Sequence, residues 1–201
     1  MSAFTSIIRS AAHNSVEELL DAFSRAAATG NLQEYFGCFY DDRSRFLGTD
    51  ASENWTAAAF FEYAAPHFKG DGTPAWKYDP IPGSRKIDIY PSAEAPLFAT
   101  FDELLSSVSF GATSRGSGTA CYTSGHWYIC SYHLTFPIPN DLAKDITKSI
   151  SKYETKKSLH AAAAVSDQHA AELLAELDME KSSATEGGKK KTSSKSSKGK
   201  R

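Results

Sequence analysis

Apolar residues in the first forty positions recur at helical spacing and predict two helices joined by a short turn. Ser15 and Glu18 form a capping box, so the first helix begins at Val16, and Gly30 ends it as a left-handed cap. Asn31 then caps the second helix. The inward stripes of the two helices are Val16, Leu19, Leu20, Phe23 and Ala27, then Leu32, Tyr35, Phe36 and Phe39.

A short apolar strand follows at residues 43–50, stopped by Gly48, and residues 50–68 read as a third helix. Asp50 and Glu53 have the spacing of a helix cap and its return partner, which is the interpretation we favour. The alternative is a carboxylate pair in a site. The two roles are compatible only if one carboxylate oxygen stays free.

After residue 74 the apolar period changes from helical to alternating, which predicts strands. Turn sequences at 91–96 and 123–125 separate consecutive strands, so the sheet should be largely antiparallel. The predicted strands are 76–81, 85–90, 96–104, 117–123 and 126–136.

Beyond the last strand the chain returns to helical propensity. Pro137 and Pro139 cannot donate to a sheet ladder, so they end the strand, and Asn140 caps a helix that runs to about residue 180. Residues 181–201 are rich in Lys and Ser, nearly without apolar residues, and predicted to be disordered.

Charge divides the chain into an acidic body and a basic tail. Residues 181–201 hold eight Lys/Arg against one Glu, a net of +7, whereas the rest holds 14 Lys/Arg against 23 Asp/Glu, a net of −9. Such a tail predicts weak contact with nucleic acid or acidic protein, a nuclear address, or added solubility. It carries no aromatic residue for stacking on bases, which argues against specific RNA recognition.

Cysteine usage and apolar runs bear on the compartment. Cys38, Cys121 and Cys130 are odd in number and lack CxxC spacing, so neither a disulfide framework nor a zinc site is expected. No apolar run approaches the length of a membrane span, and the N-terminus lacks a secretory apolar run. We therefore predict a cytoplasmic protein, or a nuclear one through its tail, with residues 1–13 as a flexible arm.

The element order and two sequence stretches resemble the SnoaL-like domain of the nuclear transport factor 2-like superfamily. "FLGTDASENW" is similar to the strand-to-helix corner of that family, and "RGSGTACYTSGHWYICSYHLTFPIPNDL" to its closing hairpin. The resemblance covers residues 14–148. It implies an α+β fold, in which a cone-shaped, curved antiparallel sheet wraps around three N-terminal helices and encloses a cavity. Residues 149–180 form a helical extension outside the resemblance.

The last strand, 126–136, is apolar on both faces. Strict alternation puts Trp127, Ile129, Ser131 and His133 on one face, which we assign to the concave, cavity side. The other face, with Tyr128, Tyr132 and Phe136, is then convex. An apolar convex face should not meet water, so we predict a homodimer through the sheet, or cover by the C-terminal helix.

Candidate site residues follow from this assignment. His133 suits proton transfer or hydrogen bonding to a ligand, although a lone histidine on a strand is more often structural. Asp50 or Asp102 is the candidate carboxylate partner. Arg115 could neutralise an anionic ligand, although a solvated hairpin arginine is the commoner case. The candidate ligand-binding residues are Trp55, Phe98, Arg115, Trp127, Ser131 and His133.

Two functions remain open from the sequence. The favoured one is a pocket domain that binds a small apolar or weakly acidic molecule or a partner protein, without catalysis. The alternative is a cofactor-independent isomerase or dehydratase that uses His133 with Asp50 or Asp102 as acid and base. The chain has no phosphate loop, Rossmann fingerprint or metal cluster, so we expect neither a cofactor nor a metal.

Overall fold

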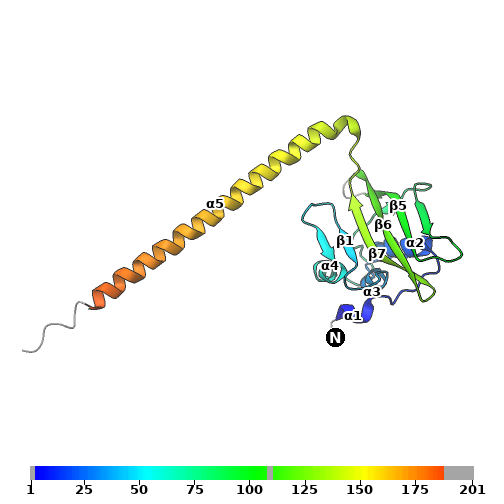
Figure 1. Ribbon diagram of the computed structural model, residues 1–201, viewed down its shortest axis with the longest axis horizontal. Helices are drawn as coiled ribbons and strands as arrows, with labels where there is room; N and C mark the ends of the chain where they lie inside the picture. Colours follow the sequence, from blue (N-terminus) through cyan, green and yellow to red (C-terminus); the bar gives the residue numbers. More distant parts are fainter. Residues whose placement is uncertain (1–2, 108–110, 188–201) are drawn as a thin grey trace, which may run out of the picture. The chain divides into compact units, whose positions relative to one another are not determined.

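A computed structural model describes residues 3–107 and 111–187 of the chain (Figure 1). It divides into two units, residues 1–137 and 138–201. The first is an α+β domain with a curved, unclosed sheet. Its helices are α1 (Ala3–Ile7), α2 (Val16–Thr29), α3 (Leu32–Gly37) and α4 (Ala57–Ala64), with a 3₁₀ turn at Ala65–His67.

The three predicted caps of the first helical hairpin are confirmed. The Glu18 amide donates to Ser15 Oγ over 3.1 Å, and Gly30 closes α2 with a φ of 65°, which favours glycine. The second hydrogen bond of the predicted capping box differs in its donor. The Glu18 carboxylate accepts from the backbone amide of Asn14 and not from that of Ser15. The Glu34 amide donates to the Asn31 side chain at the start of α3.

The sheet has seven strands, in the order β2-β1-β7-β6-β5-β3, with β4 also paired to β5. It is mixed rather than wholly antiparallel, because β1 pairs with β7 in parallel. The strands are β1 (Arg45–Leu47), β2 (Asn54–Thr56), β3 (Asp79–Pro80), β4 (Lys86–Tyr90), β5 (Phe98–Ser107), β6 (Ala112–Thr123) and β7 (His126–Thr135).

The predicted third helix begins later than expected. Residues 54–56 pair with β1 as β2, and α4 starts at Ala57, where the Ala59 amide donates to Thr56 Oγ1. Asp50 is therefore not a helix cap. Its carboxylate accepts from the Ser52 amide and hydroxyl in the loop that joins β1 to β2.

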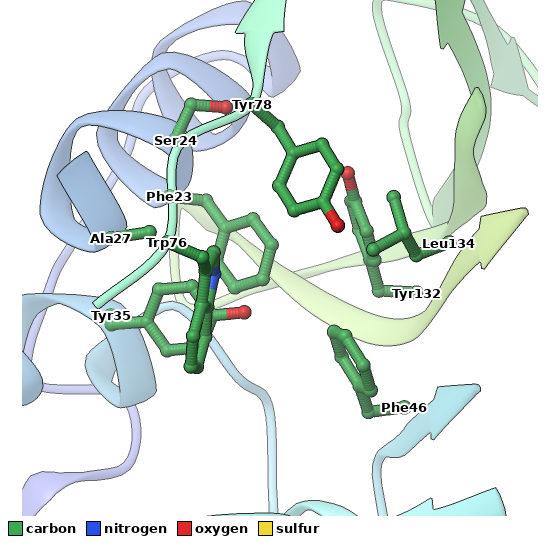
Figure 2. Close-up of a pocket in the computed structure, with 9 residues that line it drawn as sticks. All are labelled: Phe23, Ser24, Ala27, Tyr35, Phe46, Trp76, Tyr78, Tyr132 and Leu134. Atoms are coloured by element: carbon green, nitrogen blue, oxygen red, sulfur yellow. The ribbon is translucent and has the colours of Figure 1, made fainter. Parts of the chain in front are cut away.

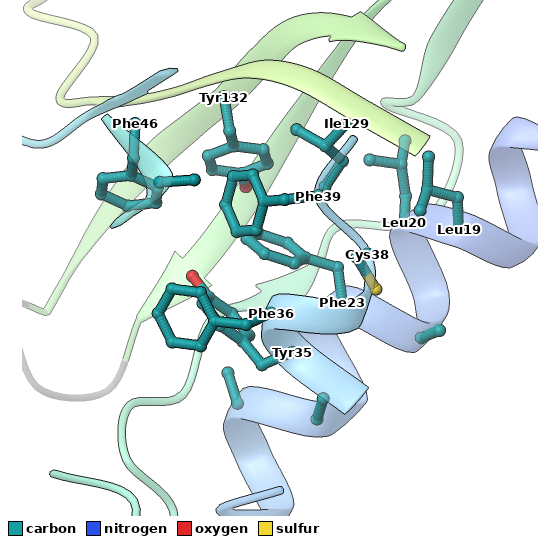
Figure 3. Close-up of a cluster of buried hydrophobic side chains, with 14 of the residues drawn as sticks. Leu19, Leu20, Phe23, Tyr35, Phe36, Cys38, Phe39, Phe46, Ile129 and Tyr132 are labelled. Carbon is teal, nitrogen blue, oxygen red and sulfur yellow. The ribbon is translucent and has the colours of Figure 1, made fainter. Parts of the chain in front are cut away.

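The hydrophobic core lies between the concave face of the sheet and helices α1–α4. Figure 3 shows the part of it that comes from α2, α3, β1 and β7. Aromatic rings dominate it: Phe23 stacks on Tyr35 with centroids 4.2 Å apart, and Phe46 stacks on Phe60 at 3.9 Å. Phe4 on α1 is only 3% exposed and packs against Phe36 and Phe61. The N-terminal segment, which the sequence predicts to be a flexible arm, thus contributes to the core at Phe4.

One buried ion pair ties the sheet to α2. Glu103 on β5 is 1% exposed and accepts from Arg85 Nε over 2.8 Å, while Arg85 also pairs with Asp21 on α2 at 2.9 Å. Burial raises the pKa of Glu103, and the neighbouring guanidinium opposes this change. The Glu103 carboxylate thus lies inside the apolar layer with Arg85 as its charged partner.

The second unit contains α5, one continuous helix over Asn140–Gly187. It crosses residue 148, where the sequence had suggested a boundary, and it includes residues 181–187 of the predicted tail. Residues 188–201 of that tail lie outside the described residues. Within the described ranges, none of the helices has both the length and the apolar character of a membrane span.

Candidate functional site

An aromatic cavity opens between β1, β2, α4 and the segment 76–78. Its volume is about 250 Å³. Among its described lining side chains, the carboxylate of Glu53 is the one that is charged at neutral pH. The lining residues are Phe46, Gly48, Thr49, Glu53, Trp55, Phe60, Tyr63, Trp76, Tyr78 and Leu134. We call this space the aromatic cavity.

The aromatic cavity shares four residues with a narrower hollow deeper in the domain (Figure 2): Phe46, Trp76, Tyr78 and Leu134. The inner hollow holds about 30 Å³, space for about one water molecule, and is closed by Phe23, Tyr35 and Tyr132. Figure 2 shows the hydroxyl groups of Tyr35 and Tyr78 directed toward this space. Phenol groups are therefore among the polar groups that line this hollow, together with the hydroxyl of Ser24.

Local sequence explains how the walls are positioned. Phe46 and Trp55 are cross-strand partners in the β1–β2 hairpin, so both side chains leave the sheet on its concave side. Trp55 stacks on Tyr63 of α4 at 4.9 Å and on Phe60 at 5.5 Å. The opposite wall is Trp76 and Tyr78, two residues apart in an extended segment, while Lys77 between them pairs with Asp79 at 3.6 Å.

The buried phenols are held in their neutral form. Burial raises the pKa of Tyr35 well above its usual value, against the effect of a hydrogen bond with Trp76. Burial also raises the pKa of Tyr132, and the charge of Glu103 raises it further. Burial and the Glu53 carboxylate raise the pKa of Tyr78. These hydroxyl groups therefore act as hydrogen-bonding groups and not as bases near neutrality.

The strict alternation predicted for the last strand is wrong in its second half, because β7 contains a β-bulge. The β6–β7 register pairs Ala120 with Ile129 but Thr119 with Ser131, and so skips Cys130. Trp127 and Ile129 face the core as predicted. Beyond the bulge Tyr132 and Leu134 face the cavity, and Ser131 and His133 face the convex side.

The predicted acid–base group therefore does not assemble in the cavity. His133, Ser117 and Asp102 lie in one row across β7, β6 and β5 on the convex face, where Asp102 pairs with Arg115 at 3.2 Å. Asp50 lies in the β1–β2 loop, and its carboxylate accepts from Ser52.

The candidate ligand-binding residues are also divided between the two faces. Trp55 lines the aromatic cavity. Trp127 is buried against Tyr122, with centroids 5.1 Å apart, away from the lining. Ser131 shares a 2.9 Å hydrogen bond with Thr119 on the convex face, and Phe98 stacks there on Tyr90 at 5.0 Å.

Several lining residues were missed from the sequence: Tyr35, Phe46, Phe60, Trp76, Tyr78, Tyr132 and Leu134. A signal existed for Trp76 and Tyr78, because they alternate with charged residues in "WKYD" and so share a side. No local signal marks the bulge that turns Tyr132 inward. Among the described residues, no group of three or more His, Cys, Asp or Glu side chains could hold a metal ion.

Comparison with known proteins identifies a family and a fold. A model of the SnoaL-like domain matches residues 16–139. No curated protein matches the chain. Among solved structures, a nuclear transport factor 2-like protein of unknown function from Pseudomonas putida KT2440 is 11% identical, with a TM-score of 0.48 over 62% of this chain and 86% of that one.

Two further solved structures are similar at the same level. A protein of unknown function from Mycobacterium tuberculosis is 14% identical, with a TM-score of 0.47 over 63% of this chain and 72% of that one. A nuclear transport factor 2-like protein of unknown function from Shewanella baltica OS155 is 13% identical, with a TM-score of 0.40 over 61% and 91%. All three are proteins of unknown function.

Proposed function

The chain belongs to the SnoaL-like domain family, and since this fold does not by itself assign an activity, we propose that it binds a small molecule in the aromatic cavity. The observation that carries the proposal is the cavity itself, about 250 Å³ in volume and walled by rings from four separate segments. A concave, largely apolar space with a few placed polar groups is the usual form of a small-ligand site.

Binding without catalysis is the better supported of the two functions open from the sequence. Proton transfer needs an acid and a base within hydrogen-bond reach of one substrate. The lining described here offers one carboxylate and several phenols, while His133 and Asp102 lie on the other face of the sheet. A cofactor-independent isomerase or dehydratase built on these residues therefore has less support.

A titration with small uncharged aromatic molecules tests this function. Two of the three tryptophans, Trp55 and Trp76, line the cavity, so ligand entry should change tryptophan fluorescence in a saturable way. Trp76→Ala should weaken binding of 2-phenylethanol at least about tenfold, because it removes one wall. Trp127→Phe is the matched control, since Trp127 is a buried tryptophan outside the lining. No saturable change with any probe, or equal loss in both variants, contradicts the proposal.

Self-association through the sheet stays a prediction, and its contact residues change. Tyr132 faces the core and cannot contribute. Tyr90 and Phe98, 42% and 45% exposed and stacked on the convex face, supply an alternative apolar contact beside Leu97. Sedimentation of the full chain tests this dimer, and a stable monomer contradicts it. The cytoplasmic or nuclear location, and the contact of the tail with nucleic acid or acidic protein, also stay predictions.

A further inference from the structure

The charge of the aromatic cavity restricts its ligand more than its shape does. Among the described lining residues, Glu53 is the one side chain that is ionic at neutral pH, and there is no Lys or Arg. The nearest basic side chains in sequence are engaged elsewhere: Arg45 donates to Asn54 over 2.7 Å, and Lys77 pairs with Asp79. An anionic ligand would thus meet a carboxylate with no Lys or Arg in the described lining to compensate for it.

Glu53 is positioned by the β1–β2 loop. The Asp50 amide donates to Glu53 Oε2 over 3.1 Å, and the backbone of Glu53 closes the loop through Gly48 and Asp50. Gly48 is required here, because a side chain at that position would collide with the Glu53 carboxylate. A carboxylate has about four acceptor positions, so this one amide leaves it able to accept from a ligand.

Aromatic rings are the second feature of this space that favours a cation. Trp55, Phe60, Tyr63, Trp76 and Tyr78 line the space that Glu53 borders. Ring faces attract cations through their quadrupole, most strongly for tryptophan, and cages of such rings recognise quaternary ammonium groups. Desolvation strengthens this attraction, and Trp55, Trp76 and Tyr78 are all partly buried.

We infer that the aromatic cavity takes an organic cation, an ammonium or quaternary ammonium group carried on an apolar body. The inference rests on the proposed function and makes it more specific. The apolar body fits the inner part of the cavity toward Phe46 and Leu134, and the cationic group lies at the Glu53 side between the rings. A weakly acidic ligand, which the sequence had left open, is disfavoured by the same charge.

The test compares three probes of similar size: benzyltrimethylammonium, its neutral carbon isostere neopentylbenzene, and the anion phenylacetate. Each is titrated into the full chain at low ionic strength and followed by tryptophan fluorescence. The cation should bind at least about tenfold more tightly than the neutral isostere, and phenylacetate most weakly. Added salt should weaken binding of the cation more than that of the neutral probe.

The variant Glu53→Gln separates charge from shape, since the amide oxygen can still accept from Asp50. It should reduce the affinity for the cation about tenfold and leave that for neopentylbenzene within about twofold. Glu62→Gln is the matched control, because Glu62 is exposed on α4 and lies outside the lining, so it changes the net charge alone. Equal affinity for cation and isostere, or equal losses in both variants, overturns the cation assignment while the binding function stands. If none of the three probes binds, both proposals fail.

Discussion

Side chains alternate between the two faces of the sheet in both halves of β7, but the alternation is reversed between the first half and the second. Before Cys130 the odd-numbered residues Trp127 and Ile129 face the core. After it the even-numbered Tyr132 and Leu134 do so, and they line the cavity system. The bulge adds one residue to β7 without adding one to β6, and one residue reverses the facing of every side chain beyond it.

This difference decides which residues can take part in function. In the first half the inward side chains complete a closed core, where Ile129 is fully buried. In the second half Tyr132 contacts Phe23, Phe46 and Phe101 and forms the inner end of the cavity. His133, which strict alternation would put in the cavity, is instead beside Ser117 on the convex face.

The strongest test of this comparison substitutes two adjacent residues just beyond the bulge, one on each face of the sheet. Tyr132→Ala should lower the free energy of unfolding by about 3–5 kcal/mol, because Tyr132 is 5% exposed and its loss leaves a cavity. Ser131→Ala, one residue earlier, should cost only about 1 kcal/mol, the value of its hydrogen bond with Thr119. Urea denaturation of both variants measures these changes.

If Ser131→Ala lowered the free energy of unfolding more than Tyr132→Ala, the register described beyond the bulge would be wrong. Tyr132→Glu gives an independent check. The unbroken alternation predicts a monomer or a poorly soluble protein for this variant, whereas the observed facing predicts an unfolded chain, because the carboxylate would be buried without a partner.

Most of the fold could be predicted from the sequence because its signals are local. The caps at Ser15, Gly30 and Asn31 are each set by one side chain or one positive φ, and the change of apolar period after residue 74 precedes strands β3 to β7. The β1–β2 hairpin was misread because Asp50 and Glu53 fit a helix cap and a loop equally well. Pairing with β1, a tertiary contact, selects the loop.

The site could be predicted only in part for a related reason. Trp55 could be identified because aromatic residues of the core commonly also form the walls of such cavities. Tyr132 and Leu134 depend on the register between β6 and β7, to which Gly116 and Gly118 contribute. A side chain at either glycine would collide with the Tyr132 hydroxyl or with the backbone of Ser131. These contacts between two strands cannot be predicted from the periodicity of one strand.

The first half of β7 lies beside His13, a titratable residue that should make the stability of the domain depend on pH. The Trp127 amide donates to the carbonyl of His13 over 2.9 Å, and His13 is itself buried beside Cys38. Burial lowers the pKa of His13, against the opposing charges of Glu18 and Glu34. The unfolded chain therefore binds a proton more readily, so His13 should reduce stability as the pH falls below about 6.5, its unfolded value.

Replacing His13 by Gln should remove this part of the pH dependence. Wild type should lose more stability than His13→Gln when urea denaturation at pH 7.5 is compared with pH 5.5, since the other titrating groups are common to both. His160→Gln on α5, where the histidine is exposed, is the control and should behave like wild type. A larger loss in His13→Gln than in wild type would reverse the sign and contradict the burial argument.

The smallest expected effect belongs to His133, the residue that the sequence favoured most. It lies on the convex face, half-buried in a row with Ser117 and Leu47, and outside the lining of both hollows. His133→Gln keeps hydrogen-bonding capacity and similar size, so it should change the free energy of unfolding by no more than about 0.5 kcal/mol. It should also leave the affinity for benzyltrimethylammonium within about twofold, where Glu53→Gln reduces it about tenfold. Titrating both variants in parallel compares directly how much each face of the sheet contributes to the affinity for the ligand. An equal loss of affinity in His133→Gln and in Glu53→Gln would indicate that the ligand binds at the convex face. It would contradict the distinction between the two halves of β7.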